Sequence, residues 1–341
     1  MMSKILVTGG TGYIGSHTVV ELLESGYETV VVDNLSNSTA GVINGIEGIT
    51  GIRPVFVKAD CTDKNAIHKI LKTERNVMGI IHFAASKSVG ESLSKPLTYY
   101  RNNIDSLLTL LELMPEFNVK GLVFSSSCTV YGRPDLMPVG EDAPVKKAES
   151  PYGNTKQIGE EIIRDAIGSD VSYKSIILRY FNPIGAHPSA KIGELPNGVP
   201  QNLVPFLTQT AAGIHKELRV FGDDYSTPDG SCIRDYINVV DLAKAHVTAI
   251  GRMLENSDCK PLEYYNLGTG KGFSVLELIH TFENVTGVKV PYKIAGRRVG
   301  DIEQIWADPR RANEILGWKA VETLENTLRS AWKWQQAISN L

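Results

Sequence analysis

Cysteine is scarce in this chain of 341 residues, and its four copies lie far apart, at Cys61, Cys128, Cys232 and Cys259. No two of them have the close spacing of a zinc site or of a disulfide framework, so we expect neither a bound metal nor disulfide bonds. An excess of charge of one sign is also missing, because 35 Lys and Arg against 38 Asp and Glu give a formal net charge of −3. This balance provides no electrostatic footprint for nucleic acid or for an anionic membrane surface.

Long hydrophobic runs are absent as well, and none approaches the roughly 20 residues that a membrane-spanning helix needs. The apolar stretch near the start, residues 5–7, is too short for the core of a signal peptide. The seven histidines include no pair at metal-binding spacing, and His82 lies in an apolar run typical of a core residue. We therefore expect a soluble, cytoplasmic enzyme with a sizeable core and no metal.

What the chain does have is a regular alternation of short apolar runs with longer amphipathic stretches in its first half. Such an alternation indicates a parallel sheet covered by helices on both faces. We expect strands at 4–7, 28–33, 54–59, 79–83, 122–125 and 172–180, and helices at 14–24, 96–114 and 152–166. The predicted fold class is α/β, a Rossmann-type doubly wound parallel sheet with a smaller C-terminal α/β domain for the substrate.

A glycine-rich loop at residues 8–15 joins the first expected strand to the first expected helix. Gly9 suits a tight turn, Gly12 lets the backbone approach a pyrophosphate, and Gly15 allows the helix to pack closely on the strand. The first turn of the helix offers free N–H groups to phosphates. Asp33, at the end of the second strand, is placed to accept a hydrogen bond from a ribose 2′-OH and to repel a 2′-phosphate. These features predict binding of NAD rather than NADP.

The texture of the sequence changes after Phe181, where residues 182–201 are rich in proline and glycine, as is typical of a loop region. We place a domain boundary there. Residues 1–181 are predicted to form the NAD-binding domain, and residues 182–341 the domain that binds the substrate. Residues 234–250 have the pattern of a strand followed by a helix and are expected to return to the first sheet.

Tyr152 and Lys156 lie four residues apart, on one face of a predicted helix. A lysine cation beside a phenol lowers the pKa of the phenol from about 10, so that it exchanges protons nearer neutrality. A run of three serines that ends at Ser127 closes the strand 122–125 upstream of this helix. Ser127, Tyr152 and Lys156 are therefore the candidate catalytic residues.

The glycine spacing together with Ser127, Tyr152 and Lys156 resembles the extended short-chain dehydrogenase/reductase family. Further blocks, at 82–87, 124–132, 179–188 and 234–239, resemble the UDP-galactose (UDP-glucose) 4-epimerases of that family. The blocks run nearly end to end, so the likeness covers essentially the whole chain.

The resemblance implies an NAD that is held tightly and regenerated in each cycle. It also implies that Tyr152, with Ser127, takes the proton of the sugar 4-OH while C4 passes a hydride to NAD⁺, and that Lys156 holds the nicotinamide ribose. The 4-keto sugar, anchored by its UDP, would turn over in the pocket and receive the hydride on its other face, which interconverts UDP-galactose and UDP-glucose. Anchoring through the nucleotide leaves the hexose free to rotate.

The resemblance assigns site residues by motif position. For NAD these are Gly9, Gly12, Tyr13, Ile14, Gly15, Asp33, Asn34, Ser38, Asp60, Cys61, Phe83, Ala84, Lys87, Asn102, Ser127, Tyr152, Lys156 and Phe181. For the UDP-sugar they are Lys87, Ser127, Tyr152, Asn182, Asn202, Arg234, Arg298, Asp301 and Ile305. The two arginines suit a clamp on the diphosphate because guanidinium groups pair well with phosphates. The resemblance further implies a homodimer. Apolar positions of 97–114 and 152–167 are the candidate interface between subunits, although a face buried within one chain would show the same pattern.

The likeness is imperfect at Ile305, where strict glucose/galactose enzymes of the family carry a tyrosine. Smaller residues there are associated with N-acetylhexosamines. One hypothesis is therefore dual specificity, with UDP-GalNAc and UDP-GlcNAc as further substrates. A predominant UDP-N-acetylglucosamine 4-epimerase is the alternative.

Three other functions stay open at this point. A nucleotide-sugar 4,6-dehydratase shares the cofactor and the first oxidation, but that group carries an Asp-Glu pair where this chain has Cys128 and Thr129. An ordinary dehydrogenase that releases NADH would need added NAD. A non-enzymatic NAD-binding scaffold typically lacks the tyrosine or the lysine, and this chain has both Tyr152 and Lys156.

Overall fold

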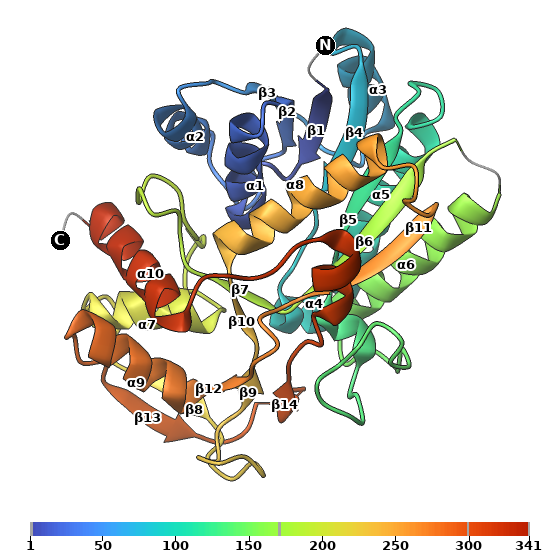
Figure 1. The fold of residues 1–341 in the computed structure, drawn as a ribbon. Coiled ribbons are helices and arrows are strands. Elements are labelled where there is room, and N and C mark those ends of the chain that lie inside the picture. Colours follow the sequence, from blue (N-terminus) through green and yellow to red (C-terminus); the bar gives the residue numbers. More distant parts are fainter. Residues whose placement is uncertain (1–2, 170–171, 299, 340–341) are drawn as a thin grey trace.

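The computed structural model describes residues 3–169, 172–298 and 300–339. Its larger part is built on a seven-stranded parallel sheet in the order β11-β6-β5-β4-β1-β2-β3 (Figure 1). The strands are β1 (Lys4–Thr8), β2 (Glu28–Asp33), β3 (Val55–Lys58), β4 (Val77–His82), β5 (Gly121–Ser127), β6 (Lys174–Tyr180) and β11 (Leu262–Leu267). β5 is buried along its whole length, as expected of a strand covered on both faces.

Helices cover both faces of this sheet, and a separate apolar core lies on each face. The first face carries α1 (Tyr13–Glu24), α2 (Val42–Thr50) and α8 (Val239–Glu255). The second face carries α3 (Lys64–Thr73), α5 (Pro96–Leu113) and α6 (Pro151–Gly168), with the short α4 (Val89–Ser94) ahead of α5. The Rossmann-type, doubly wound α/β fold predicted from the sequence is confirmed.

The remaining elements form a smaller part of the structure, whose main apolar cluster includes Leu207, Phe282 and Leu328. They are β7 (Asn182–Ile184), α7 (Leu203–Ala211), β8 (Leu218–Phe221), β9 (Ile233–Arg234), β10 (Tyr236–Asn238), β12 (Phe273–Ser274), α9 (Val275–Thr286), β13 (Tyr292–Ala295), β14 (Gln304–Ile305) and α10 (Leu324–Ser339). Two short helices complete the set, η1 (Cys128–Tyr131) and η2 (Ala312–Leu316). The short strands form three small sheets, β10 with β7, β12-β9-β14, and β13 with β8.

The chain returns to the large sheet in a way that the sequence did not predict in full. α8 packs against β4, β5 and β6, but β9 and β10, which precede it, pair outside the large sheet. The strand that extends the sheet is β11, which pairs in parallel with β6. β11 carries Glu263 and Asn266 within its six residues, so it lacks the continuous apolar run by which the other strands were predicted.

Among the described residues, no helix combines the length and the apolar character that crossing a bilayer requires.

Candidate active site

The glycine loop forms a tight turn at the carboxyl end of β1. Gly9 has a φ of +68°, a left-handed conformation that favours glycine. A Cβ on Gly15 would lie 2.8 Å from Cα of Gly10 and closer still to the carbonyl oxygen of Gly9, so this position admits no side chain without a backbone shift. α1 begins at Tyr13, and its N-cap residue, Gly12, has no side chain to cap the helix. The first N–H groups of the helix are thus left to an anion, the arrangement that suits a pyrophosphate.

Asp33 lies beside this loop, at the end of β2. Its carboxylate accepts hydrogen bonds from the N–H of Thr11 at 3.2 Å, from the N–H of Leu35 at 2.9 Å and from the hydroxyl of Ser38 at 3.2 Å. The predicted residues Asp33 and Ser38 are therefore in contact, and the hydroxyl of Thr11 also pairs with Ser38 at 2.7 Å. A carboxylate fixed in this way can receive a ribose hydroxyl without rearrangement.

Asn34 and Asp60 form the next pair along the same edge, with Nδ2 of Asn34 donating to Asp60 at 2.9 Å. Burial raises the pKa of Asp60, but hydrogen bonds from Thr62 and Asn34 outweigh it and hold the pKa below its ordinary value. Cys61 is buried, and burial raises the pKa of its thiol to about 12. The Cys61 thiol is therefore protonated and unreactive at neutral pH.

The residues predicted after β4 lie against the glycine loop and α5. A Cβ on Gly9 would come within 2.8 Å of the backbone nitrogen of Ala84. The ring of Phe83 packs on His246 with 4.7 Å between the ring centroids, and Asn102 donates to the hydroxyl of Ser86 at 3.2 Å.

Glu194 joins two of the predicted residues, Lys87 and Asn202, and was missed by sequence reasoning. Its Oε1 accepts a hydrogen bond from Asn202 at 2.7 Å and lies 3.5 Å from Nζ of Lys87. Nζ of Lys87 also lies 5.9 Å from the ring centroid of Tyr13. Glu194 belongs to a segment rich in proline and glycine without a periodic pattern, so no local signal marked it.

Ser127, Tyr152 and Lys156 meet where β5 ends against the start of α6. The hydroxyl of Ser150 caps this helix by accepting the N–H of Gly153 at 3.1 Å. The helical spacing then places Tyr152 and Lys156 on the same face, with Nζ of Lys156 5.9 Å from the ring centroid of Tyr152.

The catalytic side chains are held from the strand side as well. Nζ of Lys156 donates to the carbonyl oxygen of Ser125 at 2.6 Å, and the N–H of Thr129 donates to Oγ of Ser127 at 3.2 Å. The candidate catalytic residues thus converge, although they come from two separate motifs.

Burial dominates the protonation of this group. It lowers the pKa of Lys156 to about 8, against the carboxylate of Glu160, which raises it. Burial raises the pKa of Tyr152 above its ordinary value, and hydrogen bonding with Ser127 lowers it only in part. The expectation that Lys156 brings the pKa of Tyr152 toward neutrality is wrong for the chain by itself, because desolvation of the phenolate raises that pKa. Burial also lowers the pKa of His82 to about 3, so this neighbour is neutral.

On the substrate side, Arg234, Arg298 and Asp301 meet around one carboxylate. Oδ1 of Asp301 lies 2.7 Å from Arg298 and 3.9 Å from Arg234. The side chain of Arg298 is 57% exposed, against 17% for Arg234, so Arg298 has room to turn toward a ligand. Two guanidinium groups this close suit a diphosphate.

Ile305 is buried, with 3% of its surface exposed, in an apolar cluster with Cys128, Phe181 and Ala307. The pairing of β14 with β9 places Ile305 opposite Arg234. The predicted specificity residue therefore lies in an apolar wall between the candidate diphosphate clamp and the strand end that carries Ser127.

Asp235 is a second residue that sequence reasoning did not single out, although it adjoins Arg234 in a block that carries the resemblance. It is fully buried. Its carboxylate accepts the N–H groups of Thr269, Gly270 and Ala307 at 2.9, 3.1 and 3.2 Å. Its carbonyl oxygen accepts the N–H of Asn182 at 3.0 Å. Asp235 thus ties three chain segments together behind the substrate side.

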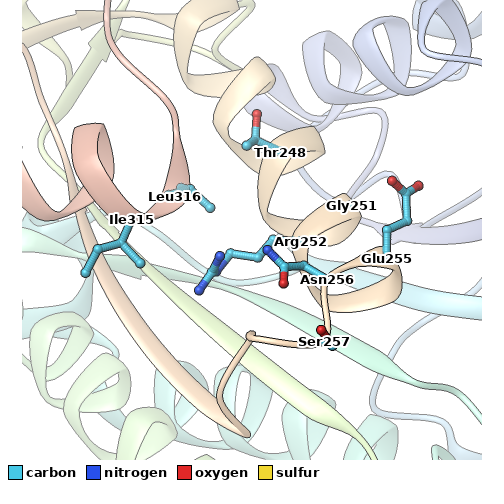
Figure 2. Close-up of a pocket in the computed structure, with 8 residues that line it drawn as sticks. All are labelled: Thr248, Gly251, Arg252, Glu255, Asn256, Ser257, Ile315 and Leu316. Carbon is cyan, nitrogen blue, oxygen red and sulfur yellow. The ribbon is translucent and has the colours of Figure 1, made fainter.

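A cavity of about 560 Å³ lies apart from all of these residues, at the end of α8 (Figure 2). Its lining consists of Thr248, Gly251, Arg252, Glu255, Asn256, Ser257, Ile315 and Leu316. The guanidinium of Arg252 is already paired with Glu263 at 2.7 Å. The candidate site is therefore defined by the converging side chains rather than by this cavity.

Comparison with known proteins matches this chain closely over its length. The family model described as GDP-mannose 4,6 dehydratase matches residues 6–331. The chain is 50% identical over 336 residues to a UDP-glucose 4-epimerase of Bacillus subtilis (strain 168), and the match covers 98% of each chain.

Two solved structures are similar throughout. The UDP-glucose 4-epimerase from Stenotrophomonas maltophila with bound NAD and formylated UDP-arabinopyranose has 48% identity and a TM-score of 0.96, covering 100% of this chain and 99% of that one. The UDP-glucose 4-epimerase from Bifidobacterium longum in complex with NAD⁺ and UDP has 45% identity and a TM-score of 0.94, covering 99% of each.

Proposed function

This chain belongs to the UDP-glucose 4-epimerases of the extended short-chain dehydrogenase/reductase family, and we propose that it interconverts UDP-galactose and UDP-glucose with NAD as its resident cofactor. The observation that carries the proposal is the convergence of Ser127, Tyr152 and Lys156 at the end of β5. This strand end lies in the same sheet edge as the glycine loop after β1.

The residues present fit NAD. The close backbone approach of Gly9 and Gly15 leaves the N-terminus of α1 open to the pyrophosphate, and the carboxylate of Asp33 provides an acceptor for the adenosine ribose. When bound, NAD would supply the hydride acceptor for C4 of the sugar and a positive charge that favours the phenolate of Tyr152. The same proposal assigns residues 1–181, with 234–250, to NAD and residues 182–341 to the UDP-sugar.

The protein side chains handle the proton and the position of the sugar. Tyr152, hydrogen-bonded with Ser127, is the general base in its phenolate form: it takes the 4-OH proton as C4 is oxidised and returns it when the ketone is reduced. The ammonium of Lys156 stabilises this phenolate. Arg234 and Arg298 hold the diphosphate, so that the hexose turns about its anchor and presents either face of C4.

Elimination of water is not part of the proposal. A 4,6-dehydratase needs an acid and a base at positions 128 and 129, where this chain has Cys128 and Thr129. Burial raises the pKa of the Cys128 thiol to about 12. A thiol held neutral beside a threonine provides neither the acid nor the base.

Product analysis by NMR tests the function. Purified protein is incubated with UDP-galactose and no added NAD, with Tyr152→Phe as the matched control. The proposal expects the wild-type chain to make UDP-glucose with the cofactor that it retains through purification. It expects Tyr152→Phe to make far less. UDP-galactose that stays unchanged even after NAD is supplied contradicts it.

Dual specificity remains a prediction that rests on Ile305. Its side chain is smaller than tyrosine and lies in an apolar wall, and the prediction is that this wall accepts a 2-acetamido group. The prediction expects UDP-N-acetylgalactosamine to be converted in the same assay, and no conversion at high enzyme concentration removes it.

The proposal includes a homodimer in the cytoplasm. α5 and α6 pack side by side, and α5 exposes 80% of Leu97 and 38% of Leu108, which suits a helical interface between subunits. All four cysteines are free thiols, as in proteins of a reducing compartment. Light scattering should give twice the chain mass of 37.3 kDa, and a monomer mass contradicts the dimer.

A further inference from the structure

A buried ion pair lies directly behind the catalytic strand end and has no role in the chemistry above. Glu160 comes from α6 and Arg179 from β6, and their side chains are only 7% and 6% exposed. Nε and one terminal nitrogen of Arg179 donate to the two carboxylate oxygens at 2.9 and 2.5 Å. Because burial strips both ions of water, such a pair is weak grounds for stability by itself. Its contacts point to another role.

The carboxylate of Glu160 also holds the catalytic strand. Its Oε1 accepts the hydroxyl of Ser126 at 2.5 Å. Ser126 immediately precedes Ser127 and lies opposite Arg179 in the pairing of β5 with β6. Side chains alternate along a strand, so fixing Ser126 on one face fixes the direction of Ser127 on the other.

Glu160 lies one helical turn after Lys156, which donates to the carbonyl oxygen of Ser125 at 2.6 Å. α6 therefore holds β5 at two consecutive residues. Burial lowers the pKa of Lys156 to about 8, and the nearby carboxylate of Glu160 acts in the other direction by raising it. The other titratable groups around Lys156 are His82 from β4 and Tyr152 from its own helix, and burial keeps both neutral at pH 7 in the chain by itself.

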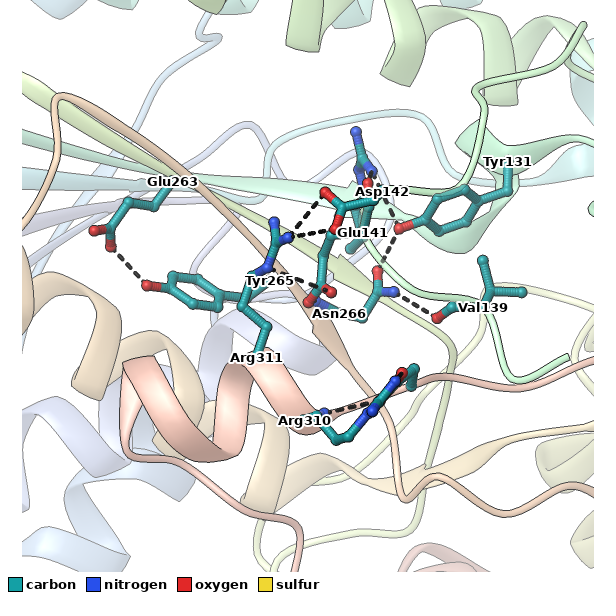
Figure 3. A network of polar contacts seen from close by, with 11 residues as sticks. Tyr131, Val139, Glu141, Asp142, Glu263, Tyr265, Asn266, Arg310 and Arg311 are labelled. Carbon is teal, nitrogen blue, oxygen red and sulfur yellow. Dashed lines mark hydrogen bonds and ion pairs between the residues drawn. The ribbon is translucent and has the colours of Figure 1, made fainter. Parts of the chain in front are cut away.

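Arg179 extends the contact toward the substrate wall. It donates to the hydroxyl of Tyr131 at 3.1 Å. That hydroxyl donates to Asn266 at 2.6 Å (Figure 3). Nδ2 of Asn266 donates to the carbonyl oxygen of Val139 at 2.8 Å. The N–H of Val139 donates in turn to the carbonyl of Trp306 at 2.9 Å, beside the predicted specificity position.

We propose that Glu160, held by Arg179, is a positioning residue for epimerisation. It directs Ser127 through Ser126, and its charge keeps the Lys156 side chain an ammonium ion beside the phenol. This inference rests on the proposed function. Glu160 acts through its neighbours and not on the substrate.

The test compares kcat against pH for the wild type and for Glu160→Gln/Arg179→Met, which removes both members of the ion pair and so leaves no unpaired guanidinium at Arg179. Loss of the carboxylate should move the basic limb of the profile to lower pH by roughly one unit, because a nearby opposite charge shifts a pKa by about that much or more. At pH values above the basic limb, a shift of one unit corresponds to about a tenfold loss of kcat. KM for UDP-galactose should stay within a factor of about two of the wild-type value. Glu160→Asp, which keeps the charge, should leave the limb near its wild-type pH.

Ser126→Ala separates positioning from charge. It removes the hydroxyl that Glu160 holds but leaves the carboxylate, so kcat should fall with the basic limb in place. This variant and Glu160→Asp decide the matter if the double variant does not fold, since wild-type kcat in Ser126→Ala overturns the positioning role.

Arg252 and Glu263 provide a matched control, because they form a second bidentate pair at 2.7 and 2.9 Å with side chains 12% and 7% exposed. Arg252→Met/Glu263→Gln should lower the melting temperature and leave the pH profile unchanged. The inference is overturned if the control variant shifts the basic limb as far as Glu160→Gln/Arg179→Met does. It is also overturned if Glu160→Gln/Arg179→Met folds and its basic limb stays at the wild-type pH. A wild-type chain that leaves UDP-galactose unchanged overturns the proposed function instead, and the inference with it.

Discussion

A single methyl group at Gly15 tests whether the glycine loop is the cofactor cradle. In Gly15→Ala the new Cβ would lie 2.8 Å from Cα of Gly10 and 3.0 Å from the carbonyl carbon of Gly9. Ordinary contact begins at 3.4 Å, so the loop and helix must separate by about 0.6 Å or more. The obstructing atoms belong to the backbone, which cannot turn aside as a side chain does.

The expected effects follow from that displacement. Overpacking of this kind costs about 1–3 kcal/mol of the free energy of unfolding. A misplacement near 1 Å costs on the order of a hundredfold in rate, so we expect kcat on UDP-galactose to fall by about ten- to a hundredfold. The N–H groups that face the pyrophosphate move with the loop, and the purified variant should contain much less NAD than the wild type.

The assay measures NAD released on denaturation, turnover of UDP-galactose with and without added NAD, and the melting temperature. Gly168→Ala is the control, because a Cβ at Gly168 meets nothing within 4 Å. It should match the wild type in all three measurements. A Gly15→Ala protein with full NAD content and wild-type turnover would refute the cradle.

Three further predictions concern single side chains. Asp33→Asn keeps the size of the side chain but loses its charge, so reconstitution with NADP relative to NAD should improve by about tenfold; unchanged rejection of NADP would count against the ribose contact. Tyr152→Phe should lower kcat by about 10²–10⁴-fold with NAD content retained, and a smaller loss would show that another group moves the proton. Burial raises the pKa of Glu263, but hydrogen bonds from Arg252 and Tyr265 outweigh it and hold the pKa at about 2 in the fold, below the roughly 4.3 of an unfolded chain. Its contribution to stability is therefore present above roughly pH 4.3 and lost as the pH falls through about 2. In urea unfolding, acid should lower the free energy of unfolding less in Glu263→Gln than in the wild type, and equal losses would contradict the assigned pKa.

Sequence patterns could predict the parts of the site that depend on local spacing. The positions of Gly9, Gly12 and Gly15 follow from what a tight strand-to-helix turn admits. The four-residue interval from Tyr152 to Lys156 is enough to place both on one helical face.

What the sequence could not predict comes from long-range packing. Glu194 meets Lys87 across 107 positions of the chain, and no local pattern records such a contact. Asp235 has buried N–H groups as partners, which carry no side-chain signature. The direction of the Tyr152 pKa also depended on burial, which the lysine spacing alone does not reveal.

In the proposed reaction, one hydride leaves C4 and returns to the same carbon within the pocket. The decisive experiment incubates UDP-galactose deuterated at C4 with the purified protein in ordinary water. We expect UDP-glucose that keeps its deuterium at C4, as read by NMR and mass spectrometry. UDP-glucose that carries hydrogen from water at C4 would contradict this return of the hydride, and so would the absence of any product.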